Sequence, residues 1–239
     1  MIEKQDPLLT IKKLISKRYP QAKSVIWAGS VNKNQATESS DLDLIIVFES
    51  LQNAYREAFI YDGWPIDTFI HDFDTLSYFF EESRIGNGIT GLAHMIINGD
   101  EILDKSEFTQ RVKFIAQKSI DLGPSLWDKD QIDKERFLIT DALDDIKYPA
   151  SYEEKMASAA WLLEALGQFY FRAQGKWCAS GKNLIRYLSD EDNLLAKEFN
   201  DVFSEVFRNG KTCRLELLVQ KILLRYGGLL WDGYSSKKS

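Results

Sequence analysis

The feature that most constrains the fold is a short apolar segment that begins with two alternating carboxylates. Leu42–Phe48 (LDLIIVF) is β-prone along its length, which is typical of a strand covered on both faces of a sheet. Asp41 and Asp43 lie two residues apart, so their side chains project from the same face. Adjacent carboxylates repel each other unless cations neutralise them, and such hard oxygen ligands suit Mg²⁺. The segment therefore predicts a buried strand that begins at a metal site.

A turn suited to phosphate precedes this strand. Ser24–Ala28 (SVIWA) is a short apolar run that predicts a strand, and Gly29-Ser30 follows it at a sharp turn. The missing Cβ of Gly29 admits close approach of a phosphate, which backbone N–H groups and the Ser30 hydroxyl can hold. The polar stretch 31–40 is expected to be a loop. A candidate phosphate site and a candidate metal site thus lie on adjacent strands.

A third carboxylate lies in the next predicted pair of strands. Residues 58–61 and 66–71 flank Asp62-Gly63-Trp64-Pro65, which predicts a hairpin with a four-residue connection. Asp67 stands within the otherwise apolar second strand. The alternative is an edge-strand carboxylate that points to water. Carboxylates inside strands are uncommon, however, so the Asp41 and Asp43 pair favours Asp67 as a third metal ligand.

The rest of the chain is predicted to be mainly helical. Apolar residues at helical spacing predict helices at residues 7–18, 74–84, 89–97, 108–120, 132–146, 152–174, 182–188, 193–208 and 212–226. Residues 101–103 are expected to add a short edge strand, and Leu122–Asp128 (LGPSLWD) is the best candidate for a boundary. We expect an α+β protein: an N-terminal domain over 1–125 with a small mixed sheet flanked by helices, then a C-terminal α-helical bundle over 126–239.

The charge and composition exclude several classes of function. The net charge is −6, and the whole excess lies in residues 1–128, which hold 13 basic and 19 acidic side chains. This balance fits either an acidic site that cations neutralise or a solvated acidic surface, and it argues against a nucleic-acid partner. No apolar run reaches the ~18–20 residues that span a bilayer, and charged residues stand where a signal peptide needs its apolar core. We expect a cytoplasmic protein with no membrane partner.

Taken together, these motifs resemble the nucleotidyltransferase superfamily of the DNA polymerase β type. The likeness lies in Gly29-Ser30, a spacer of ten residues, Asp41-x-Asp43 in an apolar strand and a third acid two strands later. The segments 62–71 (DGWPIDTFIH), 180–186 (SGKNLIR) and 227–234 (GGLLWDGY) are similar to bacterial nucleotidyltransferase-domain proteins related to aminoglycoside nucleotidyltransferases. The resemblance covers essentially the whole chain and is strongest over the first 75 residues.

This resemblance implies transfer of a nucleoside monophosphate from a nucleoside triphosphate, expected to be ATP, to a hydroxyl of an aminoglycoside-like small molecule or a protein, with release of pyrophosphate. Carried over by position, Asp41 and Asp43 would bind two Mg²⁺ or Mn²⁺ ions, and Asp67 would be the third ligand beside the acceptor hydroxyl. Gly29 and Ser30 would hold the triphosphate. Two such ions ~3.5–4 Å apart can activate the attacking oxygen and stabilise the leaving one.

Two charged pairs in the helical part are further candidates. In aminoglycoside-modifying relatives a carboxylate on the first bundle helix acts as the base. Here Asp141 and Asp145 lie four residues apart on that helix, and Asp145 is our candidate. The match to those relatives is imperfect, because this helix has no Glu after Glu135. Lys182 and Arg186, also four apart, would grip the β- and γ-phosphates. For both pairs a solvated helix face is an equally open interpretation.

Two enzymatic functions and one non-catalytic function remain open at this point. A metal-dependent nucleotidyltransferase with a small hydroxylated acceptor leads. An antitoxin-like enzyme that modifies a partner protein would use the helical part for docking. A non-catalytic nucleotide-binding sensor is the third, and the intact set of three carboxylates argues against it. The sequence leaves open the acceptor, the nucleotide base and whether the chain forms a homodimer.

Overall fold

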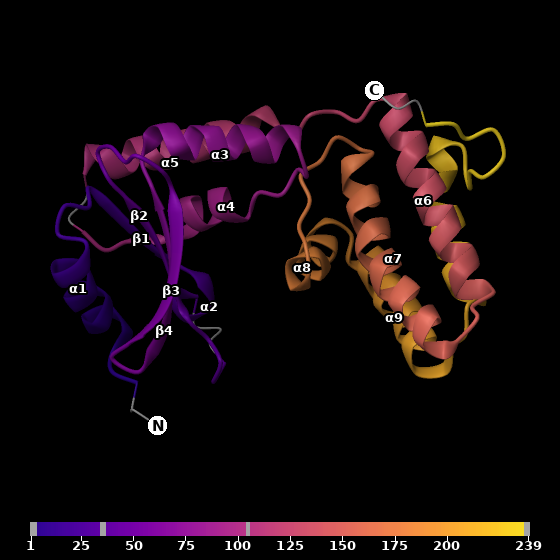
Figure 1. Cartoon of the computed structure of the whole chain (residues 1–239), viewed down its shortest axis with the longest axis horizontal. Coiled ribbons are helices and arrows are strands. Elements are labelled where there is room, and N and C mark those ends of the chain that lie inside the picture. Colours follow the sequence, from indigo (N-terminus) through magenta and orange to yellow (C-terminus); the bar gives the residue numbers. More distant parts are fainter. Residues whose placement is uncertain (1–3, 34–36, 104–105, 237–239) are drawn as a thin grey trace. The chain divides into compact units, whose positions relative to one another are not determined.

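The computed structural model describes residues 4–33, 37–103 and 106–236 and divides into two compact units (Figure 1). The N-terminal unit comprises residues up to Gly86 and Thr90–Gly123. The C-terminal unit comprises Asn87–Ile89 and the chain from Pro124 onward. None of the described helices is long and apolar enough to cross a membrane.

A mixed sheet forms the centre of the N-terminal unit. In the described residues its strands are β1 (Ser24–Ala28), β2 (Leu42–Val47), β3 (Tyr55–Tyr61), β4 (Trp64–His71) and β5 (Asp100–Glu101), in the order β3-β4-β2-β1-β5. The central pair β2 and β4 is parallel, whereas β1 pairs antiparallel with β2 and with β5, and β3 pairs antiparallel with β4. The central strand β2 is buried along nearly its whole length, as its apolar sequence predicts.

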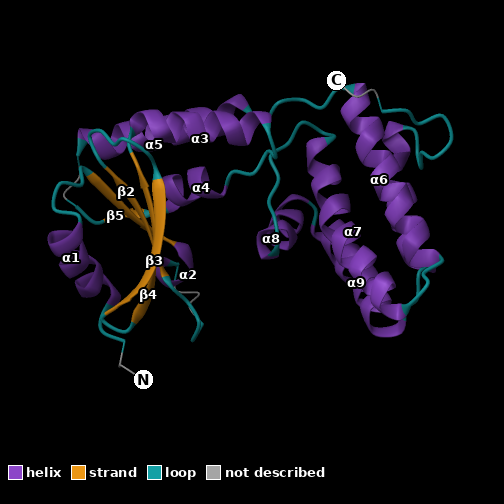
Figure 2. Cartoon of the chain, in the orientation of Figure 1, coloured by secondary structure: helices purple, strands orange, loops and turns teal. Residues whose placement is uncertain are grey.

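Helices cover both faces of this sheet (Figure 2). On one face, α1 (Pro7–Arg18) packs against the even-numbered apolar residues of β2, such as Leu44. On the other face, α3 (Phe73–Ile85), α4 (Gly91–Asn98) and α5 (Glu107–Leu122) pack against odd-numbered residues such as Ile45. Because side chains alternate along a strand, Asp43 and Asp67 share the face of Ile45. The sheet thus places both carboxylates on the face that α3, α4 and α5 cover.

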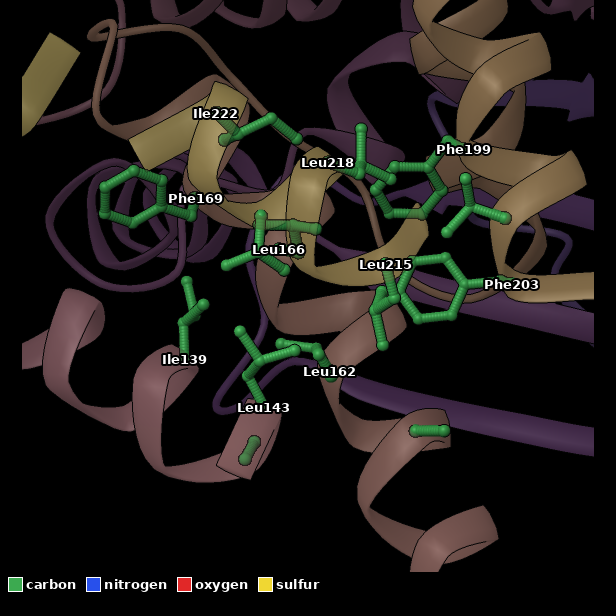
Figure 3. Close-up of a cluster of buried hydrophobic side chains, with 14 of the residues drawn as sticks. Ile139, Leu143, Leu162, Leu166, Phe169, Phe199, Phe203, Leu215, Leu218 and Ile222 are labelled. Atoms are coloured by element: carbon green, nitrogen blue, oxygen red, sulfur yellow. The ribbon is translucent and has the colours of Figure 1, made fainter. Parts of the chain in front are cut away.

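The C-terminal unit is helical in the residues that the structure describes. Its elements are α6 (Lys129–Lys147), α7 (Tyr152–Arg172), α8 (Lys182–Glu191), α9 (Asn193–Asn209), α10 (Cys213–Leu223) and the 3-10 turn η1 (Leu224–Tyr226). Figure 3 shows buried side chains from α6, α7, α9 and α10 that point toward one another, among them Leu143, Leu166 and Phe199. The two units together confirm the predicted α+β class, a mixed sheet with flanking helices followed by helices.

Three local predictions need correction. The hairpin connection is two residues long, because Asp62 and Gly63 both adopt positive φ (46° and 81°) and let β4 begin at Trp64. The stretch after Ser30 is not all loop, since a short helix, α2, spans Gly29–Asn32. The short edge strand lies at residues 100–101 instead of 101–103.

The helix predicted at 89–97 begins later, at Gly91, for a non-local reason. The Cys178 amide donates to the Gly88 carbonyl over 2.8 Å, and Ile89 forms a parallel bridge with Cys178. Residues 87–89 therefore belong to the C-terminal unit, although they lie between α3 and α4 in the sequence. The chain passes into the C-terminal unit for the last time between Gly123 and Pro124.

Candidate active site

The register of the sheet brings the three predicted carboxylates together. Asp43 pairs with Ala28 across β1 and with Asp67 across β4, so the end of β1 and the two acids lie in one row. Asp41, Asp43 and Asp67 each offer a carboxylate oxygen, and these oxygens lie within 4.8 Å of one another. We refer to these residues as the acidic triad. Asp67 is buried, whereas Asp41 and Asp43 are half-buried. The cluster is therefore reachable from solvent on the side of the first two acids.

Gly29 is required at this position by the closeness of Asp43. The backbone of Gly29 has a φ of +83°, which L side chains rarely adopt. A Cβ built on Gly29 would fall on the Oδ2 atom of Asp43 and lie 2.9 Å from its Cγ. The turn is closed by Asn32, whose side-chain amide donates to the Trp27 carbonyl over 2.9 Å. The absent side chain thus lets the triad carboxylate approach the backbone of the turn.

The hydroxyl of Ser30 lies beside the segment that leads into the triad. Its Oγ is 3.0 Å from the Oγ of Ser40, and the two hydroxyls share a hydrogen bond. Ser40 is buried, and its Oγ also accepts from the Thr37 amide over 2.8 Å. This contact ties the Gly29-Ser30 turn to the residue that precedes Asp41. Sequence reasoning did not single out Ser40; its position directly before Asp41 was the available signal.

Arg56 is a second residue of the site that the sequence reasoning missed. Its side chain extends from β3 to Asp67, with Nε 2.8 Å from Oδ1 and Nη2 2.5 Å from Oδ2. The hydrogen bonds to Asp67 raise the pKa of the guanidinium, and the charges of Asp67, Asp43 and Asp41 raise it further. All three carboxylates of the triad therefore stabilise the charged form of Arg56. The signal for it was an arginine on the strand that pairs with the strand of Asp67.

The donor set of the triad fits a divalent cation. Three carboxylates from two neighbouring strands supply hard oxygen ligands of the kind that Mg²⁺ and Mn²⁺ prefer. Two of them are half-buried, and in this structure the buried third pairs with Arg56. The three carboxylates carry more negative charge than Arg56 balances, which favours binding of a divalent ion. The residues present thus match the metal that the motif predicts.

The remaining predicted residues belong to the C-terminal unit. Asp145 is exposed on α6, and Asp141 on the same helix is half-buried. Lys182, the first residue of α8, and Arg186 are exposed. The triad belongs to the N-terminal unit, and the roles of these four residues stay predictions.

A further carboxylate on α6 has an unusual environment. Burial raises the pKa of Glu135, and a hydrogen bond of 2.9 Å from Gln131 holds one of its oxygens. Glu135 is half-buried, and the sequence alone gave no sign of its burial.

Comparisons with known proteins identify the family of the chain. A solved structure of a nucleotidyltransferase-like protein from Exiguobacterium sibiricum 255-15 is similar at 9% identity and a TM-score of 0.43, over 92% of this chain and 73% of that one. No curated protein matches the sequence. The family model described as nucleotidyltransferase domain matches residues 8–147, which include the whole sheet and the acidic triad. Because this match spans more than half of the sequence, the chain belongs to the nucleotidyltransferase domain family.

Proposed function

We propose that the protein is a divalent-metal-dependent nucleotidyltransferase. It transfers a nucleoside monophosphate, with ATP as the expected donor, to a hydroxyl of an acceptor and releases pyrophosphate. The observation that carries this proposal is the acidic triad, whose three carboxylate oxygens lie within 4.8 Å of one another beside the Gly29-Ser30 turn. Membership of the nucleotidyltransferase domain family supports the same reaction class.

Each residue of the site has a distinct task in this proposal. Asp41 and Asp43, half-buried, hold the cations, for which Mg²⁺ is the preferred ion. When bound, a pair of divalent cations would favour ionisation of the acceptor hydroxyl and neutralise charge on the leaving pyrophosphate. Gly29 lets a phosphate approach the backbone, and the Ser30 hydroxyl donates to a phosphate oxygen. Asp67 is the third cation ligand and lies on the acceptor side of the site.

The C-terminal unit supplies the acceptor side in this proposal. Asp145 is the proposed base toward the acceptor hydroxyl, with Asp141 and Asp144 of the same helix as the alternatives, and Lys182 and Arg186 bind the leaving pyrophosphate. A small molecule with several hydroxyls, of the aminoglycoside kind, is the expected acceptor. This assignment rests on the resemblance of the helical segments to aminoglycoside nucleotidyltransferases and on the charges of those helices.

Two steps test the function. The first is a panel of nucleoside triphosphates, with and without Mg²⁺ or Mn²⁺, read as a thermal shift; a ligand at 100 times its Kd stabilises the folded state by about 2.7 kcal/mol. The second is pyrophosphate release with aminoglycoside, nucleotide and protein acceptors. Both assays are repeated with Asp43→Asn, which removes a carboxylate of the triad. Its control is Asp74→Asn, which removes an exposed carboxylate on α3 outside the triad. Tight triphosphate binding with no acceptor in any class would favour the nucleotide sensor over the enzyme.

A further inference from the structure

The buried carboxylate of the triad is fully engaged by an arginine. Both oxygens of Asp67 accept hydrogen bonds from Arg56, at 2.8 and 2.5 Å, in the two-point geometry of a guanidinium on a carboxylate. The side chain of Asp67 is only 10% exposed, whereas that of Arg56 is 64% exposed. A buried carboxylate needs a compensating cation. Arg56 supplies that cation from the solvent side.

The fold directs Arg56 toward the triad. Arg56 lies on β3 opposite Phe69, two residues from the position that pairs with Asp67, and therefore on the same face. Its guanidinium carbon lies 4.7 Å from the centre of the Phe69 ring, which supports the side chain along the sheet. The negative charges of Asp43 and Asp41 attract the same guanidinium. Arg56 is thus placed where a bound cation would also be attracted.

An arginine and a divalent cation in this position compete. A guanidinium on both oxygens of Asp67 occupies lone pairs that a metal ion would use, and its positive charge repels the ion. We propose that Arg56 is a built-in counter-cation of the acidic triad, and that a divalent cation binds only as the guanidinium withdraws from Asp67. This inference rests on the proposed function, because it takes the triad as the metal site. It assigns Arg56 a positioning and gating role that the motif does not contain.

The neighbouring pair of Arg18 and Glu57 provides a matched control. Arg18, the last residue of α1, pairs with Glu57 of β3, and its guanidinium carbon lies 4.2 Å from the centre of the Phe59 ring. Glu57 projects from the opposite face of β3 to Arg56, since the two are adjacent in the strand. Removing Arg18 thus breaks an ion pair and a ring contact to β3, and removing Arg56 breaks an ion pair and a ring contact to β4 of the same sheet. Only Arg56 faces the triad.

The test is calorimetric titration of MnCl₂, without nucleotide, into the full chain. Arg56→Gln should bind Mn²⁺ about tenfold more tightly than wild type, the order expected when one unit charge is removed a few Å from a divalent ion in a solvent-screened site. Arg56→Lys, which keeps the charge without the two-point contact, should lie between them, and Arg18→Gln should match wild type. Circular dichroism checks that each variant is folded.

A second measurement uses the wild-type chain alone. The ¹⁵N resonance of the Arg56 Nε–H group, assigned by its loss in Arg56→Lys, should be protected from solvent exchange without metal and lose that protection as Mg²⁺ is added. An unchanged Nε–H signal at saturating Mg²⁺, or equal or weaker Mn²⁺ binding by Arg56→Gln, would overturn the counter-cation role and leave the metal site intact. Mn²⁺ binding that survives in Asp41→Asn/Asp43→Asn would instead refute the site on which the proposed function rests. If neither wild type nor Arg56→Gln bound Mn²⁺, both proposals would fall together.

Discussion

Replacement of Gly29 by alanine tests the geometry of the site through two separable costs. The first is backbone strain, because φ at this residue is +83°, and an L residue held in the left-handed region loses roughly 1–2 kcal/mol. The second is the overlap of the new Cβ with the Asp43 carboxylate, whose Cγ would be 2.9 Å away. Asp43 must then rotate away from the triad. We expect Gly29→Ala to lower the free energy of unfolding by about 2–4 kcal/mol in total.

Two other glycines of the N-terminal unit separate these costs. Gly123 has a φ of +71° with nothing within 4 Å of a built Cβ, so Gly123→Ala carries strain alone, about 1–2 kcal/mol. Gly91, at the start of α4, has neither positive φ nor a close neighbour, and Gly91→Ala should be neutral or stabilise by up to ~1 kcal/mol.

Urea denaturation, followed by circular dichroism, gives the three stabilities, and calorimetry gives the metal-dependent affinity for a triphosphate. Only Gly29→Ala should lose that affinity. If Gly29→Ala and Gly123→Ala were equally destabilised and both bound triphosphate normally, the contact between Gly29 and Asp43 would have no functional meaning.

The remaining predictions concern single charged residues. Asp67→Asn should retain most of the triphosphate affinity yet lose pyrophosphate release, because its carboxylate faces the acceptor; full turnover would refute that role. Burial opposes ionisation of Asp72, but hydrogen bonds from Thr75 and the Leu51 amide outweigh it and lower the pKa. That carboxylate therefore stabilises the fold above its ordinary pKa of 3.8, and the contribution is lost as pH falls below that value. Asp72→Asn keeps an oxygen that can cap α3 but cannot ionise. Between pH 5 and pH 3 its free energy of unfolding, measured by urea denaturation, should therefore fall less than that of wild type. Lys182→Ala should weaken triphosphate binding by about 1.5–3 kcal/mol without slowing the saturated reaction, whereas an unchanged affinity would remove Lys182 from the site.

The sequence predicts well those parts of the fold that depend on local pattern. The strand Ser24–Ala28 and the helix Pro7–Arg18 have the predicted bounds, because an apolar run and a helical repeat each leave one way to bury their side chains. The triad follows from the same logic. Alternation along β2 puts Asp41 and Asp43 on one face, and the parallel pairing of β2 with β4 brings Asp67 beside them.

What the sequence missed depends on register and on contacts between distant segments. A four-residue hairpin connection would place Ile60 opposite Asp67 and Arg56 four residues away. The two-residue turn places Ala58 opposite Asp67, and Arg56 then falls within reach on the same face. The pairing of residues 87–89 with Cys178 is likewise invisible in local pattern, because the partners lie 90 residues apart and the sequence of either segment gives no sign of the other.

The central claim is that the acidic triad binds a divalent cation and, through it, a nucleoside triphosphate. The most direct measurement is calorimetric titration of ATP into the wild-type chain and into Asp41→Asn/Asp43→Asn, each with Mg²⁺ and with EDTA. We predict that wild type binds ATP in Mg²⁺ and loses this binding in EDTA. The double variant should fail to bind ATP under both conditions. Equal affinity of wild type and the double variant in Mg²⁺ would contradict the account, because the carboxylates would then have no part in nucleotide binding.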